Sequence, residues 1–517
     1  MIKSKGLVRV LIFSCFLVLG GTFYPFSAFA IYKDDFKLAD SSEVRANLWL
    51  EIRPIANNYF VASWVDRYEE LGWDGYIRKY TIKGEPVGNR IKLDIDSLMV
   101  RSPIFLAPQK NGNIIAAWLW HDFVHPPYRL QATVRIYDSL LNPITGEIKV
   151  DTLSDLTKFR WVDVVGLSTD SIGCFVVLYT IDNYRPFLQK FSPTGVKLEE
   201  PVGLYTPYEY DEDFPCQDSA YVCHGGGGWD MSMRPNGELI VVYWGASSII
   251  QDKGVPMGRL FNSDLTPKGQ VFIIPCEGLP CTLGDTLLLL GSGDPKVEYA
   301  ESGDFVVTWN QGYDPYWTGL IGARRFNSDG SPKGESFIVN EHIPGFLYNR
   351  PRVAVGENGD FVIFWSDRYS QFGWHNLWAQ AYDSVGIPQG INYRVNTLDG
   401  SLDGNEENFD AFIVDSTFVI AWLDVFRDYP PKIGWPYAQT MDLKLVGVYS
   451  PGDLDGDWGV KLNDLIYLIN YIFKGGPKPY PVWTGDVTAD CKVNLADVIY
   501  LTNYVFKGGA APIPGCA

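Results

Sequence analysis

The chain has 517 residues, of which 46% are hydrophobic, 15% aromatic and 20% charged. This composition is typical of a globular protein with two or three domains and excludes a disordered chain. The formal net charge of −18 argues against a nucleic-acid partner, because phosphate backbones are bound by clusters of Lys and Arg.

Residues 1–30 have the three parts of a signal peptide. Lys3, Lys5 and Arg9 form a basic start, an apolar stretch runs from Val10 to Gly21, and Ala28-Phe29-Ala30 has the pattern of a cleavage site. An N-terminal membrane anchor is the alternative, although the apolar stretch is short for a span. No later segment is long enough to cross a bilayer. We therefore expect a secreted or cell-surface protein, with the periplasm as the alternative compartment.

One phrase recurs seven times in residues 31–450: a turn, a run of apolar residues and then an aromatic residue. Examples are GNIIAAW, which ends at Trp118, and GDFVVTW, which ends at Trp309. The seven aromatic residues are separated by 54, 61, 64, 66, 56 and 57 positions; they are Trp64, Trp118, Tyr179, Tyr243, Trp309, Trp365 and Trp422. A second phrase follows each copy and usually contains a turn with Asp or Asn, Gly and Pro, as in ARRFNSDGSPKG from Ala323.

Each repeat predicts four strands, of which the second is apolar throughout and must be covered on both faces. A single four-stranded sheet cannot cover its own faces, whereas sheets packed around an axis cover one another. The repeats loosely resemble those of exported bacterial propeller proteins, and we predict a mainly β fold with a seven-bladed β-propeller over residues 31–450. A stack of β-sandwiches and a solenoid are the alternatives. The segment from Asp34 to Leu38 is expected to close the ring by pairing with the seventh blade, beside Val446 to Tyr449.

The repeat region contains no recognisable catalytic or cofactor-binding motif, and we predict no such residue in it. Four acids follow the repeated aromatic residue, and we expect them to form ion pairs or turn caps within their loops; they are Asp66, Asp122, Asp367 and Asp424. A role as paired carboxylates in glycoside hydrolysis is the alternative. The phrase HGGGGWD, from His224 to Asp230, is interpreted as a flexible loop.

Aromatic residues are frequent after the second strand of each repeat, where they could stack on sugars, bind a protein partner or pack between blades. They are Tyr68, Trp73, Trp120, Phe123, Tyr313, Tyr316, Trp317, Phe372, Trp374 and Trp378. Export permits disulfides, and proximity in sequence favours three pairs: Cys216–Cys223, Cys276–Cys281 and Cys491–Cys516. Cys174 lies in an apolar run and is expected to be a buried free thiol.

The last part of the chain, residues 451–517, contains a duplicated segment. DLDGDWGVKLNDLIYLINYIFKGG starts at Asp453 and DVTADCKVNLADVIYLTNYVFKGG starts at Asp486, and 14 of the 24 aligned positions are identical at a period of 33. Each copy is an acidic loop followed by an amphipathic helix. A pair of glycines ends each helix, and the two short helices must pack on each other.

The spacing of the oxygen-bearing residues predicts two Ca²⁺ sites, because calcium prefers six to eight oxygen ligands supplied by positions 1, 3, 5, 7, 9 and 12 of a loop. In the first copy the ligands are Asp453, Asp455, Asp457, the carbonyl of Gly459, and Asp464. In the second copy they are Asp486, Thr488, Asp490, the carbonyl of Lys492, Asn494 and Asp497. The second site is expected to be weaker because Thr488 replaces an acid.

Two calcium loops with one helix each resemble the type I dockerin of cellulosome-like systems. The resemblance covers the last 67 residues, and it implies a small EF-hand-type module that docks into a cohesin-like domain of a scaffold protein. This sequence differs at loop position six, which is Trp458 and Cys491, and at position nine of the first copy, which is Lys461. The helix-start pairs Leu462-Asn463 and Leu495-Ala496 leave the identity of the cohesin partner open.

Three functions follow from these observations. The first is a non-catalytic binding and assembly protein, whose propeller binds a glycan or a protein and whose dockerin-like module attaches it to a scaffold. The second is a polysaccharide-degrading enzyme, either a hydrolase or a lyase, carried by the dockerin. The third is a structural surface protein whose dockerin-like module packs on its own propeller, since the junction at Ser450-Pro451 is short.

Overall fold

The computed structural model describes most of the repeat region and of the C-terminal segment. It covers residues 36–38, 47–56, 58–68, 72–93, 99–100, 102–122, 129–151, 162–181, 185–204, 225–247, 253–275, 293–311, 320–340, 351–368, 375–395, 409–415, 417–426, 433–442, 450–454, 459–476, 479, 482–513 and 515–516. The predicted signal peptide lies outside these residues. The described part holds no helix that is long and apolar enough to cross a membrane.

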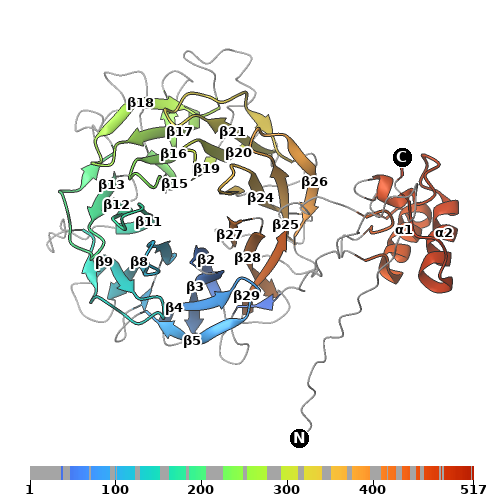
Figure 1. Ribbon diagram of the computed structural model, residues 1–517, viewed down its shortest axis with the longest axis horizontal. Helices are drawn as coiled ribbons and strands as arrows, with labels where there is room; N and C mark the ends of the chain where they lie inside the picture. Colours follow the sequence, from blue (N-terminus) through green and yellow to red (C-terminus); the bar gives the residue numbers. More distant parts are fainter. Residues whose placement is uncertain are drawn as a thin grey trace, which may run out of the picture.

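Seven antiparallel sheets are arranged as the blades of a ring (Figure 1). Blade 1 contains β2 (Asn47–Ile55), β3 (Tyr59–Tyr68), β4 (Gly72–Thr81) and β5 (Pro86–Lys92). Blade 2 contains β6 (Met99–Val100), β7 (Phe105–Pro108), β8 (Ile114–Asp122), β9 (Arg129–Tyr137) and β10 (Ile148–Lys149). Blade 3 contains β11 (Val162–Thr169), β12 (Phe175–Ile181), β13 (Arg185–Phe191) and β14 (Val202–Gly203). Blade 4 contains β15 (Gly225–Met233), β16 (Leu239–Ser247), β17 (Lys253–Phe261) and β18 (Pro267–Ile273).

The other three blades follow the same order. Blade 5 contains β19 (Gly293–Tyr299), β20 (Phe305–Gln311), β21 (Leu320–Phe326) and β22 (Phe337–Ile338). Blade 6 contains β23 (Pro351–Val355), β24 (Phe361–Arg368), β25 (His375–Tyr382) and β26 (Pro388–Arg394). Blade 7 contains β27 (Phe409–Val414), β28 (Thr417–Phe426) and β29 (Ile433–Asp442), and β1 (Phe36–Lys37) completes it. The predicted seven-bladed propeller is therefore confirmed.

The hydrophobic core lies between the blades. Seven clusters of buried side chains each combine residues from two consecutive blades, and one of them joins blade 7 to blade 1. The seven repeated aromatic residues are all at most 2% exposed, because the second strand of every blade is covered on both faces. Burial of apolar surface between neighbours is thus the interaction that holds the ring together.

The ring is closed by a strand from the N-terminal side of the chain. Phe36 and Lys37 pair with Ala438 and Tyr437 of β29, and the next residue, Leu38, is 1% exposed. The Phe36 ring packs on Gly84 at the β4–β5 turn. A Cβ added to Gly84 would lie 2.4 Å from this ring. The closing strand is therefore confirmed, but its partner is β29 and not Val446 to Tyr449; residues 443–449 lie outside the described part.

The third strand of each repeat carries an Arg or Gln that serves the same structural purpose in most blades. Arg78 donates to the carbonyl of Gly88 at 3.2 Å and Arg324 to that of Gly334 at 3.0 Å. Gln189 donates to the carbonyl of Glu199 at 2.8 Å. These carbonyls belong to the fourth strand or the turn before it, where the strand pairing is short or bulged. The side chain thus replaces missing backbone hydrogen bonds.

The phrase at residues 224–230 is partly a strand. Gly225 to Asp230 belong to β15, the innermost strand of blade 4, and pair with β16 through two register shifts. The prediction of a flexible loop is therefore wrong for these residues, because the glycines allow the backbone to bulge while it keeps its place in the sheet. His224 lies outside the described part of the chain.

Two short helices follow the propeller, α1 (Leu462–Lys474) and α2 (Leu495–Lys507), with a 3₁₀ turn η4 (Val482–Gly485) between them. Their shared core contains Leu454, Leu465, Leu468, Val487, Val498 and Leu501. Gly475 and Gly508 end the helices in the left-handed conformation, at φ values of 67° and 66°. The two amphipathic helices and their glycine ends are as predicted.

The cysteines of the described residues agree with prediction. Cys491 and Cys516 form a disulfide, and Cys174 is a buried free thiol. The other two predicted pairs, Cys216–Cys223 and Cys276–Cys281, lie outside the described part, so they stay predictions. The domain boundaries at residues 30 and 450 also stay predictions.

The closing strand leads to a stability prediction. Deleting residues 31–40 should lower the melting temperature by several degrees, because it removes β1 and the buried Leu38. The substitution Leu38→Ala should by itself lower the free energy of unfolding by about 2–4 kcal/mol, the usual range for a buried leucine. Chemical denaturation measures both, and Lys37→Ala, on an exposed side chain of the same strand, is the matched control. An unchanged melting curve for the deletion would show that the ring closes without this strand.

Candidate functional site

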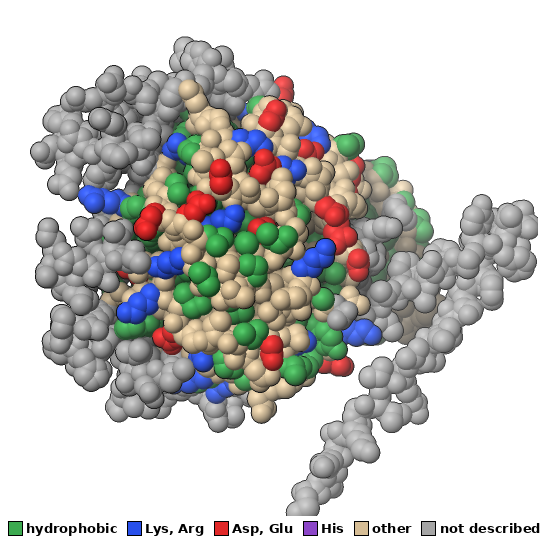
Figure 2. All heavy atoms as spheres, turned by 60° about the vertical axis from the view of Figure 1, so that its left-hand side comes forward, with side chains coloured by type: hydrophobic (Ala, Val, Ile, Leu, Met, Phe, Trp, Pro, Cys, Tyr) green, Lys and Arg blue, Asp and Glu red, His purple; other side chains and the backbone are tan. Residues whose placement is uncertain are grey.

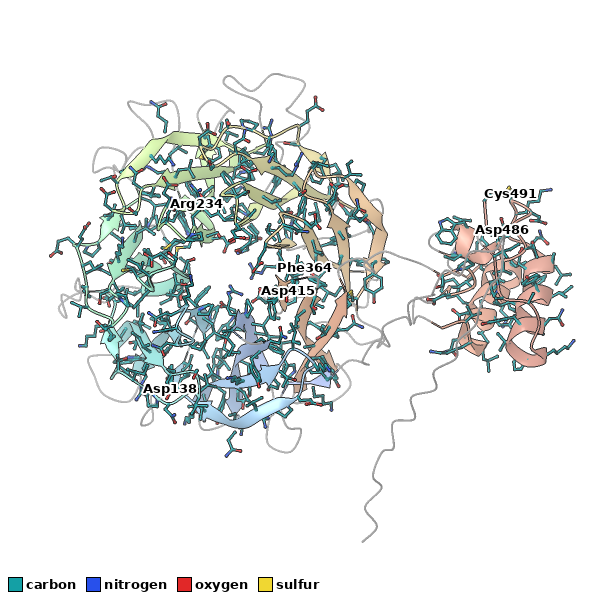
Figure 3. The ribbon with its side chains drawn as sticks, in the orientation of Figure 1. Asp138, Arg234, Phe364, Asp415, Asp486 and Cys491 are labelled. Atoms are coloured by element: carbon teal, nitrogen blue, oxygen red, sulfur yellow. A yellow bond between two sulfur atoms is a disulfide. The ribbon has the colours of Figure 1, made fainter. Side chains whose placement is uncertain are left out.

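The innermost strands of the seven blades carry ionisable side chains where the blades converge. These strands contact one another in sequence around the ring, from β2 through β7, β11, β15, β19, β23 and β27 back to β2. Figure 3 shows the side chains of the inner strands directed toward the centre of the ring. The acidic and basic residues on these strands are Glu51, Arg53, Asp163, Asp230, Asp294, Lys296, Glu298, Arg352 and Asp410.

Three of the acids link one blade to the next by accepting hydrogen bonds from backbone N–H groups. Asp410 of blade 7 accepts from Ile52 of blade 1 at 2.9 Å, and Glu51 of blade 1 accepts from Leu106 of blade 2 at 3.0 Å. Asp230 of blade 4 accepts from Val297 of blade 5 at 2.9 Å. Innermost strands have an unpaired edge, and these carboxylates satisfy N–H groups along it.

Arg53 holds two of these carboxylates together. Its guanidinium lies 2.9 Å from Glu51 and 2.5 Å from Asp410, so it joins blade 1 to blade 7 at the centre of the ring. Burial alone would lower the pKa of Arg53, but Asp410, Glu51 and Glu298 raise it by more, and the guanidinium stays charged. About a third of the Arg53 side chain is exposed, 34%, although it lies on an innermost strand. Solvent therefore reaches this position.

Glu298 differs from the other three acids because, in the part of the chain that the structure describes, its side chain accepts no hydrogen bond from a backbone N–H of the next blade. It accepts a hydrogen bond of 3.4 Å from the hydroxyl of Ser232 in blade 4, and it is exposed. Although the side chain reaches solvent, the protein around it removes part of the solvation of the carboxylate and raises the pKa of Glu298 to about 7, against the lowering effect of Arg53. Because Arg53 is in blade 1 and Glu298 in blade 5, the two groups act on each other across the ring.

The pKa of Glu51 is also raised by loss of solvation. It is 8% exposed, and burial raises its pKa to about 7 although Arg53 lowers it. The charge of one guanidinium, Arg53, therefore acts on two carboxyl groups whose pKa is raised to about 7. Such perturbation is common at catalytic sites, and it also occurs in structural ion-pair networks.

The backbone is strained on the two strands that carry these glutamates. Trp49 and Asp294 are non-glycine residues with φ values of 50° and 49°, in a region that L-residues rarely adopt. Both lie in bulges, between Leu48 and Glu51 in β2 and between Gly293 and Lys296 in β19. Bulges and strained residues cluster next to functional sites, where they redirect side chains.

The sequence did not indicate Glu51, Arg53, Glu298 or Asp410 as site residues. The acids that it did indicate lie near the end of the second strand of their blades, and only Asp66 among them has a described side chain. Asp66 is 0% exposed and pairs with Arg90 of β5 at 2.9 Å, and burial raises its pKa to about 7. The expected ion pair is therefore present, but its arginine comes from the fourth strand and not from the adjacent loop. The side chains of Asp122, Asp367 and Asp424 lie outside the described part.

Three of the predicted aromatic residues pack between blades. Trp73 and Trp120 contact the core between blades 1 and 2, and Trp378 contacts the core between blades 5 and 6. The Trp73 ring also packs on Trp49 with 5.3 Å between centroids. Packing, one of the three expected roles, thus accounts for these residues; of the others, only the backbone of Tyr68, in β3, is described.

The second loop of the C-terminal segment brings three predicted calcium ligands together. Asp486, Asp490 and Asp497 each place a carboxylate oxygen within 4.8 Å of the others. Asp486 and Asp497 are 0% exposed, and in the described residues no other group of three His, Cys, Asp or Glu side chains meets this criterion. Buried, adjacent carboxylates repel one another unless a cation lies between them. Oxygen donors of this kind fit Ca²⁺.

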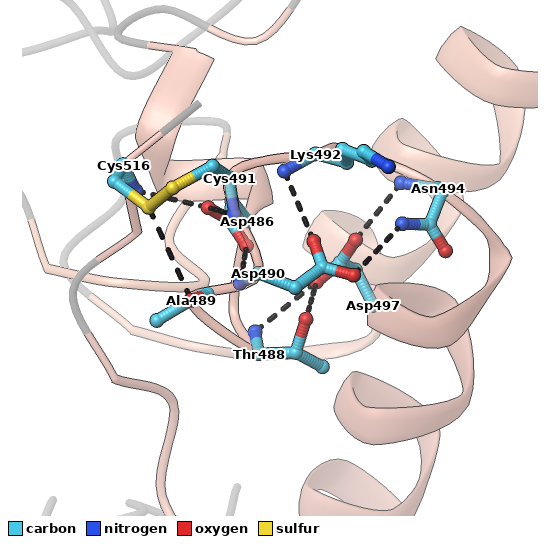
Figure 4. Close-up of a disulfide and its surroundings, with 9 residues drawn as sticks. All are labelled: Asp486, Thr488, Ala489, Asp490, Cys491, Lys492, Asn494, Asp497 and Cys516. Atoms are coloured by element: carbon cyan, nitrogen blue, oxygen red, sulfur yellow. Dashed lines mark hydrogen bonds between the residues drawn. A yellow bond between two sulfur atoms is a disulfide. The ribbon is translucent and has the colours of Figure 1, made fainter.

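The remaining predicted ligands of this loop surround the three acids (Figure 4). The Thr488 hydroxyl donates to Asp497 at 2.9 Å, and the backbone N–H of Lys492 donates to Asp490 at 3.0 Å. Asn494 uses its side-chain oxygen to cap α2, accepting from Ala496 at 2.8 Å, while its amide group donates to Asp490 at 3.3 Å. Asn494 therefore orients a ligand and begins the helix at the same time.

The first loop is described only at its ends. Asp453 is 2% exposed and Asp464 0%, and Asp464 accepts from the N–H groups of Leu454 and Lys461 at 2.7 Å each. Asp497 accepts in the same way from the N–H of Asn494 at 2.8 Å, so the two copies share this contact. Gly459 is described and half-buried, while Asp455 and Asp457 lie outside the described residues.

Comparisons with known proteins were made at the level of family, sequence and structure. No family model and no curated protein matches the chain. An α-L-arabinanase of Penicillium chrysogenum, solved with arabinobiose, is 11% identical with a TM-score of 0.39 and covers 81% of this chain and 100% of its own. A GH93 α-L-arabinofuranosidase of Fusarium graminearum, also solved with arabinobiose, is 11% identical with a TM-score of 0.42 and covers 80% and 99%. A polysaccharide lyase is 10% identical with a TM-score of 0.44, and the match covers 81% of this chain and 94% of the lyase chain.

The first of the three expected functions, a non-catalytic binding protein, is not supported by these neighbours, which are named as an α-L-arabinanase, an α-L-arabinofuranosidase and a polysaccharide lyase. At about 10% identity the likeness itself is one of fold, so the residues that could act must be taken from this chain.

The raised pKa of Glu51 leads to a pH-dependent stability. Below its ordinary value of 4.5 Glu51 is protonated in the folded and the unfolded chain. Between pH 4.5 and about pH 7, Glu51 keeps its proton in the folded chain but not in the unfolded chain. Stability from this group therefore falls as the pH rises, by up to about 1.4 kcal/mol per pH unit. Glu51→Gln should flatten the dependence of the unfolding free energy on pH in this window, as measured by denaturation at several pH values.

Glu85→Gln, at an exposed turn of the same blade, is the control for this measurement and should follow the wild type. A Glu51→Gln variant with the wild-type slope would show that Glu51 titrates in the ordinary range.

Proposed function

We propose that the propeller is a polysaccharide-acting enzyme, a glycoside hydrolase or a lyase, with its reacting groups at the centre of the ring. The observation that carries this proposal is Glu298, an exposed carboxyl with a pKa of about 7 opposite a carboxylate pair held by Arg53. An acid that keeps its proton near neutral pH is what cleavage of a glycosidic bond requires.

The two sides of the centre differ in a way that suits distinct roles. Asp410 is fixed by Arg53 and by the Ile52 N–H, so it is a rigid acceptor that could stabilise positive charge on a sugar ring or orient a water molecule. Glu298 accepts a 3.4 Å contact from a hydroxyl and, among the described residues, no hydrogen bond from a backbone N–H, so it could donate its proton to a leaving oxygen. Hydrolysis of glycosides uses such a pair.

The enzyme proposal predicts activity that depends on Glu298. Purified protein should cleave at least one member of a panel of arabinan, pectin, xylan and polygalacturonate, measured by reducing ends for a hydrolase and by ultraviolet absorbance of the unsaturated product for a lyase. Glu298→Gln should lower kcat/KM by about 100-fold or more, as expected for loss of a general acid or base, without a change in melting temperature.

Glu335→Gln, at an exposed position of the same blade, is the matched control and should keep full activity. For a hydrolase, wild-type activity should fall as the pH rises through about 7, where Glu298 loses its proton. The proposal fails if no member of the panel is cleaved, or if Glu298→Gln is as active as the wild type.

We propose in addition that the C-terminal segment is a dockerin-like module of an exported protein, which binds two Ca²⁺ ions and attaches the enzyme to a cohesin-like domain. The first site would be held by Asp453, Asp455, Asp457, Gly459 and Asp464, and the weaker second site by Asp486, Thr488, Asp490, Lys492 and Asp497, with Asn494 beside it. Bound calcium would neutralise the acids and fix each loop against its helix.

A duplicated apolar surface supports the docking function. Leu462, Ile466 and Phe473 of α1 are 48%, 46% and 58% exposed, and their counterparts Leu495, Ile499 and Phe506 of α2 are 52%, 54% and 60% exposed. Residues at this spacing share one face of a helix. Exposed apolar side chains at matching positions of both copies are typical of a binding surface.

The module leads to a prediction about calcium and docking together. The double substitution Asp464→Asn and Asp497→Asn in the full chain should abolish the heat of calcium binding, because it removes a buried carboxylate from each site. It should also abolish capture by an immobilised cohesin domain, which the wild type should show in calcium and lose in a chelator. Calorimetry and pull-down measure the two effects, with Glu335→Gln as control. Calcium binding without capture by cohesin would favour a module that packs on its own propeller.

A further inference from the structure

The chain after α2 turns back and crosses the second loop. The Tyr500 hydroxyl donates to the carbonyl of Ala511 at 3.1 Å, and the N–H of Ile513 donates to the carbonyl of Val487 at 3.4 Å. Pro512 lies against Gly452 at the start of the first loop, where a Cβ would be 2.8 Å from the proline ring. This tail, residues 509–513 and 515–516, thus contacts both loops of the module.

The end of the tail contributes directly to the environment of Asp486. One carboxylate oxygen of Asp486 accepts from the N–H of Cys516 at 2.9 Å and from that of Cys491 at 3.0 Å. The other oxygen accepts from the N–H of Asp490 at 3.0 Å. One of the three donors that orient this acid therefore comes from a residue thirty positions further along the chain.

The disulfide is what keeps this donor in place (Figure 4). It joins Cys516 to Cys491, the sixth residue of the loop, which adopts a φ of 63°. Gly515 fits closely beneath the bond, because a Cβ there would lie 2.5 Å from the carbonyl oxygen of Asp486 and 2.6 Å from that of Trp483. Both cysteines are exposed, so a reductant can reach them.

We infer that the Cys491–Cys516 disulfide makes the second calcium site redox-sensitive, with the tail as its positioning element. The inference rests on the proposed calcium-binding function. In the oxidised protein the tail fixes Asp486 and shields it from water, so the ligand is oriented before the cation arrives. Reduction by a dithiol forms two cysteine thiols and converts the dithiol to its own disulfide. Without the covalent bond the end of the tail separates from the loop and releases Asp486.

The two sites should respond differently. The first copy has Trp458 where the second has Cys491, so no disulfide can fix a tail on its loop in the same way. Groups that orient metal ligands typically change metal affinity by about 10-fold to 100-fold when they are removed. Reduction should therefore weaken the second site by about that factor and leave the first site unchanged.

The test is calorimetric titration of the full-length protein with calcium chloride, before and after treatment with dithiothreitol. The dissociation constant of the second site should rise at least about tenfold on reduction. The double variant Cys491→Ser and Cys516→Ser should have the weaker constant from the start and should not respond to dithiothreitol, which excludes effects through the other cysteines. Circular dichroism in saturating calcium checks that its helices are folded.

A second variant separates the position of the tail from the bond itself. Gly515→Ala keeps both cysteines but forces the tail away from Asp486, so it should weaken the second site even when oxidised. If the wild type and the double cysteine variant bind calcium equally in both conditions, the inference is overturned while the calcium module stands. If the wild type binds no calcium at all, the proposed module and the inference both fail.

Discussion

No blade of this ring can bury its own surface, and this constraint determines the rest of the structure. The second strand of every blade is apolar on both faces, so each of the seven cores is built from two blades. A linear array of such sheets would leave an apolar face exposed at each end. Closure removes both ends, which is why the core between blades 7 and 1 contains Leu38 from the closing strand. Trp and Tyr recur because a large ring fills the space between two diverging sheets.

The same arrangement brings the unpaired backbone edges of the innermost strands together at the centre of the ring. Seven inner strands meet there with one edge each unpaired, and buried backbone N–H groups need acceptors. Asp410, Glu51 and Asp230 supply them from the preceding blade. Carboxylates that meet at a centre repel one another, and Arg53 offsets this for two of them. The propeller thus gathers acids near its axis for structural reasons, and loss of solvation raises the pKa of two of them, Glu51 and Glu298, to about 7.

The structural features that repeat along the sequence could be predicted from it, whereas the residues that occur only once in the ring could not. The aromatic residues, the turns, the closing strand and the paired loops were all visible because each occurs in several copies or completes a copy. Glu51, Arg53 and Glu298 lie on the first strands, whose sequences differ from blade to blade. A signal was present nonetheless: LEIRP and KVEY place charged residues within strands that a propeller covers on both faces. Charges at such positions must face the axis, but their partners come from blades that are distant in sequence, and only the closed ring brings them together.

The C-terminal copies show the same relation between repetition and function. Both loops share the buried acids, the glycine ends and the exposed apolar faces, which are the features that a duplicated binding module needs. They differ at several loop positions, and at position six the second copy carries a cysteine in a left-handed conformation that usually favours glycine. A strained residue persists where its surroundings fix it, and here the disulfide and the close fit of Gly515 do so. The strain is thus tied to the tail, which determines the orientation of Asp486 in the loop through the N–H of Cys516.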